Sequence, residues 1–549
     1  MSRPEARTSS LVRRTALAAA LLGAGACAEQ PAVESGRDPT SVPVAERYGG
    51  TAILAGLGEI QTMNAFFSRD YVTDQFQAYV LFTTLLRYDD RLQPEPYLAR
   101  SWSVSPDSNE VTFRLRTDMR WHDGAPTTAR DVAFTFDRVK DPALPYPNRS
   151  AFDAWESVEV LDDYTIRFTL RPHADFLHGW TALPIMPRHI LEDTPVEDLA
   201  SHPFGTSQPV GNGPFRFVEH LPGDRWTFEA NPDFPPDLGG RPFLDRLVYR
   251  VIPNETTLFA ELRSGGVDMY VRVAPVFVEQ IAEDPELRLA AYPFPNYSFI
   301  AWNPRRPFFA DRTVRRALTM ALDRLELVEV VRHGLGTPAV GPVGSWHWAY
   351  DSAWRPLPYA PDSAAAILER AGWRDVDGDG IRERNGVRFS FELVTNESRE
   401  RGAIAELVQG YLARVGVEAR PRIREHQALI SDVTSPERRF EAFLLSWTQG
   451  MVLDERDQWA CDRIGKPLQF VSFCDPALDA VMDSIPRATD RAVQRHLIRR
   501  YGTLIAEAQP FTFLYVEKRA DALGPRLQDV APDFRGELAG VRNWWLLRP

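Results

Sequence analysis

The chain has 549 residues, with 63 basic and 75 acidic side chains and a formal net charge of −12. A single hydrophobic core does not grow to this size, so the chain is expected to fold as two or three lobes. The acidic balance argues against binding to nucleic acid or to anionic lipid surfaces, and after the N-terminal segment no apolar run is as long as a membrane span.

Residues 1–26 are predicted to be a signal peptide. Four arginines precede an apolar stretch at 16–26, which is too short to cross a bilayer. The stretch ends in Ala24-Gly25-Ala26-Cys27, which resembles a lipobox, so Cys27 is predicted to carry a lipid that anchors the protein to a membrane. The alternative is an ordinary signal cleaved after the small residues, with Cys27 unmodified.

Residues 27–45 contain several Pro, Ser and Gly residues and are predicted to be a flexible tether. Export places the folded part in an oxidising compartment, where the two remaining cysteines, Cys461 and Cys474, are predicted to form a disulfide. Two buried free thiols are the alternative. A metal site at these cysteines is disfavoured because they have no nearby His to complete a ligand set.

Strand and helix patterns then intermix along the whole chain, which predicts an α/β fold. A strand is expected at 50–55 and a helix at 75–86. Alternating apolar residues predict strands at 111–116 and 164–170, and another strand at 215–219. Between them, Thr128 and Asp131 have the spacing of a capping box and predict that a helix begins there.

The segment 111–136 also carries a long motif, F-x-L-R-x-x-x-x-W-H-D-G-x-P-x-T-A-x-D-V-x-F-T-F. This motif resembles the signature of the family 5 extracellular solute-binding proteins, the oligopeptide, dipeptide and nickel receptors of ABC importers. Further stretches resemble blocks of the same family in the same order, over about residues 48–530; they lie at 59–64, 98–102, 211–215, 264–268, 303–323 and 371–380.

The resemblance implies a type II periplasmic-binding-protein fold, with two lobes, a hinge and a small extra domain. Lobe I would comprise 46–90, 205–292 and 508–549, the extra domain 91–204, and lobe II 293–507. The chain would cross between the lobes near 292 and near 507. Ligand would lie between the lobes and be enclosed when they close.

The resemblance also suggests ligand-binding residues. Asn64 lies in a family turn, Trp447 ends a strand that lines the family's cleft, and Tyr515 and Arg519 match a C-terminal strand whose side chains face the ligand. Peptide receptors have an Asp three residues after that Trp, where this chain has Gly450. The nearest acid, Asp454, is therefore predicted to pair with a ligand ammonium, with Glu455 and Asp457 as rivals.

Two aromatic residues are added from their surroundings alone. Trp346 and Trp348 lie in a loop rich in Gly and Pro, where aromatic residues are less often part of a core than on a helix, so they are predicted to line the cleft. Packing between lobe and loop is the alternative for both.

Catalytic and metal sites find little support. Asp375, Asp377, Asp379 and Glu383 resemble a calcium loop, but Gly386 stands where the bidentate Glu should be, so a turn is preferred and no metal is predicted. No motif of a zinc protease, serine hydrolase or P-loop occurs, and no catalytic residue or cofactor is predicted.

The sequence therefore predicts a receptor of an ABC importer, in the periplasm or cell envelope and held to the membrane only by lipid. Its ligand is predicted to be an oligopeptide, and its partners the permease subunits. The alternatives are another solute on the same scaffold, such as a nickel chelate, haem, glutathione or an oligosaccharide, or a secreted hydrolase.

Overall fold

The computed structural model describes residues 39–68, 70–107, 109–146, 149–152, 154–171, 178–450, 453, 455–488 and 490–548. The predicted signal peptide, Cys27 and the first part of the predicted tether lie outside these residues. Short 3-10 turns at Pro39–Ser41 and Val44–Glu46 occupy the end of the tether. Among the described residues, no helix combines the length and the apolar character that a membrane crossing requires.

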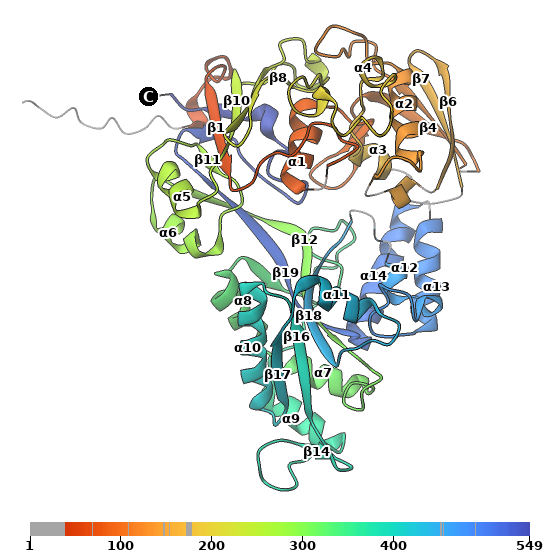
Figure 1. Cartoon of the computed structure of the whole chain (residues 1–549), viewed down its shortest axis with the longest axis vertical. Coiled ribbons are helices and arrows are strands. Elements are labelled where there is room, and N and C mark those ends of the chain that lie inside the picture. The colour runs from red at the N-terminus through yellow and green to blue at the C-terminus, as the bar shows by residue number, and fades with distance from the viewer. Residues whose placement is uncertain are drawn as a thin grey trace, which may run out of the picture. The chain divides into compact units, whose positions relative to one another are not determined.

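One sheet runs through both lobes of the fold (Figure 1). Its strands lie in the order β17 (Glu418–Ile423), β16 (Ser390–Thr395), β18 (Ala442–Thr448), β12 (Arg288–Trp302), β19 (Phe511–Leu523), β11 (Met269–Tyr270), β1 (Thr51–Gly56), β10 (Arg246–Val251), β9 (Arg225–Ala230) and β8 (Phe215–Leu221), with β13 (Gly336–Pro338) also paired to β19. The strands predicted at 50–55 and 215–219 are β1 and β8.

The long strands β12 and β19 connect the lobes. They pair from Arg288↔Leu523 to Ala301↔Phe511, with a register break between Pro293 and Tyr297. On the lobe I side β19 also pairs with β11, and on the lobe II side β12 pairs with β18. We call residues 293–296 of β12 and 516–519 of β19 the hinge.

The second crossing therefore lies inside β19 and not near 507. The first half of β19, including Phe511 and Phe513, packs into the core of lobe II, and its second half, including Ala520 and Ala522, packs into lobe I. The crossing is displaced because a single uninterrupted strand carries the chain from one lobe to the other, and no turn marks the boundary in the sequence.

Lobe I shares one apolar core with the predicted extra domain. The extra domain has its own four-stranded sheet, in the order β4 (Ala99–Val104), β5 (Glu110–Leu115), β7 (Thr165–Leu170) and β6 (Trp155–Asp162). The helices of this half are α1 (Tyr71–Phe76), α2 (Ala129–Lys140), α3 (His178–Ala182), α4 (Arg188–Leu191), α5 (Glu255–Arg263) and α6 (Val278–Glu283). The small hairpin β2 (Leu86–Tyr88) and β3 (Pro94–Pro96) and the pair β20 (Leu527–Gln528) and β21 (Trp545–Leu546) complete it.

Two helices predicted from local sequence patterns lie in this half of the protein. Helix α2 begins with the predicted capping box, in which the N–H of Thr128 donates to Asp131 at 2.8 Å. The helix predicted at 75–86 begins and ends earlier: α1 begins at Tyr71 and passes into a π-helical turn that ends at Leu81. The carbonyl of Leu81 accepts the N–H groups of Asn212 and Gly213, so a distant loop takes the acceptor that a continuing helix would need.

Lobe II contains the remaining helices, α7 (Arg312–Met320), α8 (Arg324–Arg332), α9 (Pro361–Arg370), α10 (Arg399–Ala413), α11 (His426–Thr434), α12 (Arg456–Trp459), α13 (Pro476–Ser484) and α14 (Arg491–Ala508), and the hairpin β14 (Glu383–Arg384) and β15 (Val387–Arg388). Its strands separate two apolar clusters. One contains residues of α13 and α14, and the other residues of α7 to α10. Alternate residues of β12 and β19 contribute to the two clusters, as expected for a sheet buried on both faces.

Candidate functional site

The end of β18 offers main-chain groups next to the hinge. The carbonyl of Leu444 accepts the hydroxyl of Thr395 on β16, so it points away from β12. Main-chain groups alternate along a strand, and those of Ser446 and Thr448 therefore point the same way. Within β18, only Ala442 and Phe443 pair with β16, and no strand of the described residues pairs with 445–448 on this side. The last residues of β18 thus form a free strand edge.

On the lobe I side of the hinge lies a group of polar and aromatic side chains that we call the hinge cluster. Its members are Tyr71, Arg272, Tyr292, Phe294, Arg519, Asp521 and Glu537. They come from the start of α1, the residue pair after β11, the two hinge strands and the C-terminal segment, so parts of the chain far apart in sequence meet here.

Two acids form the buried part of the hinge cluster. Asp521 is fully buried and Glu537 is 2% exposed. Asp521 Oδ1 accepts the N–H of Arg272 at 2.8 Å, and Glu537 Oε2 accepts the hydroxyl of Tyr292 at 3.3 Å. Arg272 has a positive φ of 59°, a conformation that this bond to Asp521 helps to hold. The second oxygen of each carboxylate has no hydrogen-bond partner among the described residues.

Two arginines stack on the aromatic members. The guanidinium carbon of Arg519 lies 3.1 Å from the ring centroid of Phe294 and 4.8 Å from that of Tyr71, and the guanidinium carbon of Arg272 lies 4.9 Å from the Tyr71 ring. Tyr71 and Phe294 pack edge to face with their centroids 5.2 Å apart. These cation–π contacts hold two positive charges at one ring.

Burial shifts the pKa values of the two acids and of Arg519. It raises the pKa of Asp521 well above its usual range, and the charge of Glu537 adds to that rise. Burial also raises the pKa of Glu537, although Arg272 and Arg519 oppose it. The pKa of Arg519 is lowered by burial and, next, by the neighbouring charge of Arg272. Burial therefore disfavours the charged forms of both acids and of Arg519.

Comparison with known proteins identifies the family of this chain. A family model described as "Bacterial extracellular solute-binding proteins, family 5 Middle" matches residues 93–460. The chain belongs to this family. It is 30% identical over 508 residues to the oligopeptide-binding protein AppA of Bacillus subtilis (strain 168), covering 91% of this chain and 92% of that protein.

Two further comparisons extend the result. The solved structure of AppA from Bacillus subtilis, in complex with a nonapeptide, matches with a TM-score of 0.71 at 29% identity and covers 91% of this chain and 100% of that one. Heme-binding protein A of Haemophilus influenzae is 32% identical over 351 residues, which cover 60% of this chain and 61% of that protein. The family 5 protein described here thus has the two-lobe type II fold that its motifs predict.

Two of the predicted ligand residues lie on strands in or next to the hinge. Trp447 pairs with Tyr297 on β12, which pairs with Val516 on β19, three residues before Arg519. Trp447 is partly buried and packs against Phe470 at the end of the free edge. The structure therefore brings Trp447 and Arg519 to the same part of the family 5 protein.

The other predicted ligand residues have structural contacts. Asn64 is buried, donates to the carbonyl of Leu199 at 3.1 Å and accepts the N–H of Phe66 at 3.2 Å. The hydroxyl of Tyr515 donates to Glu400 at 2.6 Å inside lobe II. We assign both residues to holding the fold, because their polar atoms already have partners in lobe interiors.

The predicted aromatic pair also packs within lobe II. Trp346 is 5% exposed and belongs to the lobe II core. Trp348 lies under Arg491 and Arg495 of α14, with guanidinium carbons 4.0 Å and 5.6 Å from its ring centroid. The packing between lobe and loop that the sequence left open thus accounts for both residues.

Two acids after β18, Asp454 and Glu455, are candidates for pairing with a ligand ammonium. Asp454 lies outside the described residues. Glu455 is buried and accepts hydrogen bonds from Gln449 at 2.6 Å, from Trp459 at 2.8 Å and from the hydroxyl of Tyr501. Glu455 therefore binds the loop after β18 to α12 and α14, and its oxygens have partners within the protein.

The cysteines and the acidic loop belong to lobe II. Cys461 and Cys474 form a disulfide whose Cα atoms lie 4.7 Å apart. Asp375 accepts the N–H groups of Gly378 at 2.8 Å and Gly380 at 3.0 Å, and Asp379 forms an ion pair with Arg388. The acidic residues thus hold the turn between α9 and β14, although their carboxylates come within 4.8 Å of one another.

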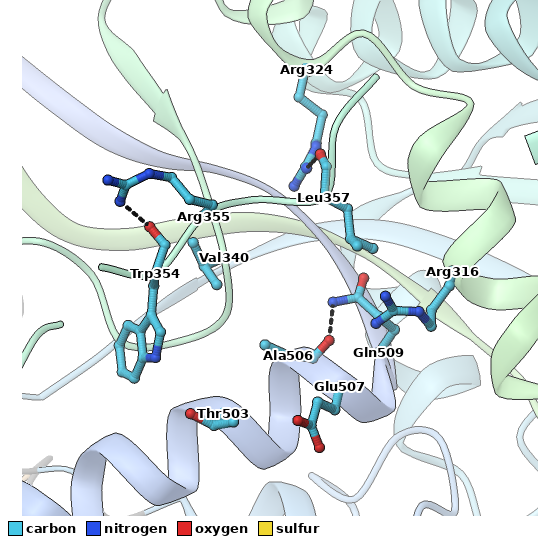
Figure 2. A pocket seen from close by; sticks show the side chains of 10 residues that line it. All are labelled: Arg316, Arg324, Val340, Trp354, Arg355, Leu357, Thr503, Ala506, Glu507 and Gln509. Atoms are coloured by element: carbon cyan, nitrogen blue, oxygen red, sulfur yellow. Dashed lines mark hydrogen bonds between the residues drawn. The ribbon is translucent and has the colours of Figure 1, made fainter. Parts of the chain in front are cut away.

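A cavity of about 220 Å³ also lies away from the hinge, within lobe II (Figure 2). It is lined by Arg316, Trp354 and residues near the end of α14. The guanidinium of Arg324, which reaches its wall, donates to the carbonyls of Ala339 and Phe513 at 2.8 Å each. No predicted ligand residue lines this cavity, and Arg324 at its wall is already bonded to the backbone, so we place the candidate site at the hinge.

Sequence reasoning missed Tyr71, Arg272, Asp521 and Glu537. Asp521 and Arg519 are two apart on one strand, and that spacing puts both side chains on the same face of the sheet. A charged pair at this spacing, followed by the apolar end of the strand, is a usable signal. Tyr71, Arg272 and Glu537 lie in irregular segments, and only the folded chain brings them together.

Proposed function

We propose that the protein captures peptides between its two lobes and delivers them to the permease of an ABC importer. The observation that carries the proposal is the similarity to AppA over nearly the full length of both chains, because AppA is named for binding oligopeptides. The family of extracellular binding proteins to which the chain belongs places this capture outside the cytoplasm.

The free edge of β18 supports a peptide ligand. An extended peptide can add to a strand edge through main-chain hydrogen bonds, which do not depend on the peptide's side chains. Ser446 and Thr448 each offer an N–H and a carbonyl on this edge, beside the partly buried ring of Trp447. Such a site would accept many sequences, as a receptor for nutrient peptides requires.

The hinge supports capture by closure. Among the described residues, only β12 and β19 extend through both lobes of the sheet. A change of backbone angles within residues 293–296 and 516–519 can therefore move one lobe against the other. The register break in β12 already interrupts the ladder there. Anchoring through a lipid on Cys27 would hold the receptor near the permease.

Ligand retained through purification tests the proposal. The full chain is expressed with its signal, purified from the cell envelope under native conditions and measured by native mass spectrometry. We expect a heterogeneous set of added masses that resolve into peptides after denaturation. A single added mass matching haem or a metal chelate would refute the peptide proposal, and the similarity to Heme-binding protein A makes that outcome specific.

A further inference from the structure

We propose that residues 89–93, the tip of the β2–β3 hairpin, form a latch that fastens lobe I to lobe II and slows the release of a captured ligand. The inference rests on the proposed function and adds a residue, Leu92, that controls how long the ligand is held. It starts from the packing of this one short segment. Leu86, at the base of the hairpin, belongs to the core of lobe I, whereas Leu92 belongs to the apolar cluster of lobe II that contains residues of α13 and α14.

The base of the hairpin is attached to lobe I. The N–H of Ala99, at the start of β4, donates to the carbonyl of Leu85, which precedes the hairpin, at 2.9 Å. Arg535 of the C-terminal segment donates to the carbonyl of Tyr88 at 2.9 Å. The hairpin is therefore expected to move with lobe I when the lobes separate.

The latch is shaped by Asp89. Its Oδ1 accepts the N–H of Arg91 at 2.9 Å and that of Gln93 at 2.7 Å, so the carboxylate closes the turn from inside. This turn holds Leu92 at a positive φ of 55°, a left-handed conformation that is unfavourable for a residue with a large side chain. Contacts of the leucine side chain offset that cost, and those contacts lie in lobe II.

Lobe II binds the latch through apolar and polar groups. Leu92 is 3% exposed, and its carbonyl accepts a hydrogen bond from Arg491 Nη2, at the start of α14, at 2.9 Å. The guanidinium carbon of Arg491 lies 4.0 Å from the ring centroid of Trp348, which packs against the same α13–α14 cluster. The stacked ring thus fixes a charged donor at the place where the carbonyl of the latch binds.

Two further residues of lobe I join this contact. Phe534, in the C-terminal segment, is 9% exposed and belongs to the α13–α14 cluster, and Tyr88 packs against that cluster. The hydrogen bond from Arg535 to the carbonyl of Tyr88 links the two segments that carry these side chains. The contact between the lobes therefore combines apolar burial with a charge-assisted hydrogen bond.

Opening of the lobes has to break this contact. When backbone angles change within the hinge, the latch leaves the α13–α14 cluster, which exposes Leu92 and removes its bond to Arg491. Burial of one leucine side chain corresponds to about tenfold to a hundredfold in an equilibrium between a closed and an open form. Because an enclosed ligand leaves when the lobes open, the latch slows release by a similar factor.

Replacement of Leu92 by Asn tests the latch. Asn adopts the left-handed conformation more readily than Leu, so the turn should form, but burial of its amide in an apolar cluster is unfavourable. The full-length wild type and variant are loaded with a pool of short synthetic peptides of random sequence that carry an isotope label. Unlabelled peptides are then added in excess, and the label that stays with the protein is followed over time by mass spectrometry.

We expect Leu92→Asn to release the label about tenfold to a hundredfold faster than the wild type, with little change in the association rate, because the latch closes after the ligand has entered. Arg491→Gln removes one hydrogen bond and should speed release by about threefold to tenfold, and by less in the Leu92→Asn background. The matched control is Leu325→Asn, the same replacement at a leucine of lobe II that is 66% exposed, and it should release the label at the wild-type rate.

Equal release rates for Leu92→Asn and the wild type would overturn the latch and leave the peptide proposal intact. If Leu92→Asn does not fold, Arg491→Gln decides the question alone, and release at the wild-type rate overturns the latch. A wild type that retains no peptide would overturn the peptide proposal, and small-angle scattering of the ligand-free proteins then tests the latch. In that case a larger radius of gyration for Leu92→Asn than for the wild type supports it, and equal radii overturn it.

Discussion

Replacing Glu455 distinguishes an acid that holds the fold from an acid that binds ligand. Glu455 is 7% exposed and accepts hydrogen bonds from Gln449, Trp459 and Tyr501. In Glu455→Ala these three donors lose their acceptor in buried surroundings, where each unsatisfied group costs about 1–3 kcal/mol. Because the costs do not add fully and water can enter the space, we expect a loss of about 3–5 kcal/mol in the free energy of unfolding.

Urea unfolding followed by tryptophan fluorescence measures this loss, since Trp459 itself contacts Glu455. Glu455→Gln keeps one accepting oxygen but directs an amide N–H₂ at the same donors, so its loss should be smaller. The control is Glu437→Ala, which changes an exposed acid of the same lobe 3.8 Å from Arg439 and should alter stability by less than about 0.5 kcal/mol.

The opposite pattern would refute the reasoning. If Glu455→Ala unfolds at the same urea concentration as the wild type but no longer binds free-amine peptides, Glu455 is the acid that pairs with the ligand ammonium, and its internal hydrogen bonds contribute nothing measurable. If stability falls as expected, the ammonium partner, where one exists, is another acid of the loop, and Asp454→Asn becomes the variant to measure.

Three further predictions concern other parts of the chain. Changing both Cys461 and Cys474 to Ser should lower the free energy of unfolding by about 3 kcal/mol, the loop-closure value for a separation of 13 residues, and alkylation of two thiols in the unreduced, denatured wild type would contradict the bond. Cys27→Ser should move the protein from the membrane fraction to the soluble fraction; a wild type that is already soluble and carries no lipid mass would refute the anchor. Because burial raises the pKa values of Asp521 and Glu537, these two groups bind more protons in the native state than in the unfolded state. Their contribution to stability should therefore be fully present below the ordinary carboxyl pKa and should be lost as pH rises through the raised values. Asp521→Asn should flatten that fall, and an unchanged slope in urea unfolding across this pH range would contradict it.

Local sequence patterns predicted the elements whose structure depends on near neighbours. The capping box at Thr128 and Asp131 fixed the start of α2, and strict alternation predicted β5 and β7. The helix predicted at 75–86 failed where a distant loop took the carbonyl of Leu81, a contact that no local pattern records.

The site was predicted only in part, for a related reason. Trp447 and Arg519 lie in regular strands that match family motifs, and both reach the hinge. Tyr71, Arg272 and Glu537 were missed because they lie in segments without periodicity, and their chemistry appears only when the chain folds. Tyr515 was assigned to the ligand from its motif, but its hydroxyl has Glu400 as a partner, and only coordinates reveal such a partner.

Hydrogen–deuterium exchange on the peptide-bound protein tests the central claim, capture of a peptide at the free edge of β18, most directly. We expect bound peptide to slow exchange of the amides of Ser446 and Thr448, because these groups would gain main-chain acceptors, and to leave β6 of the extra domain unchanged. Stoichiometric binding that leaves both amides exchanging at the rate of the ligand-free protein would contradict capture at this edge.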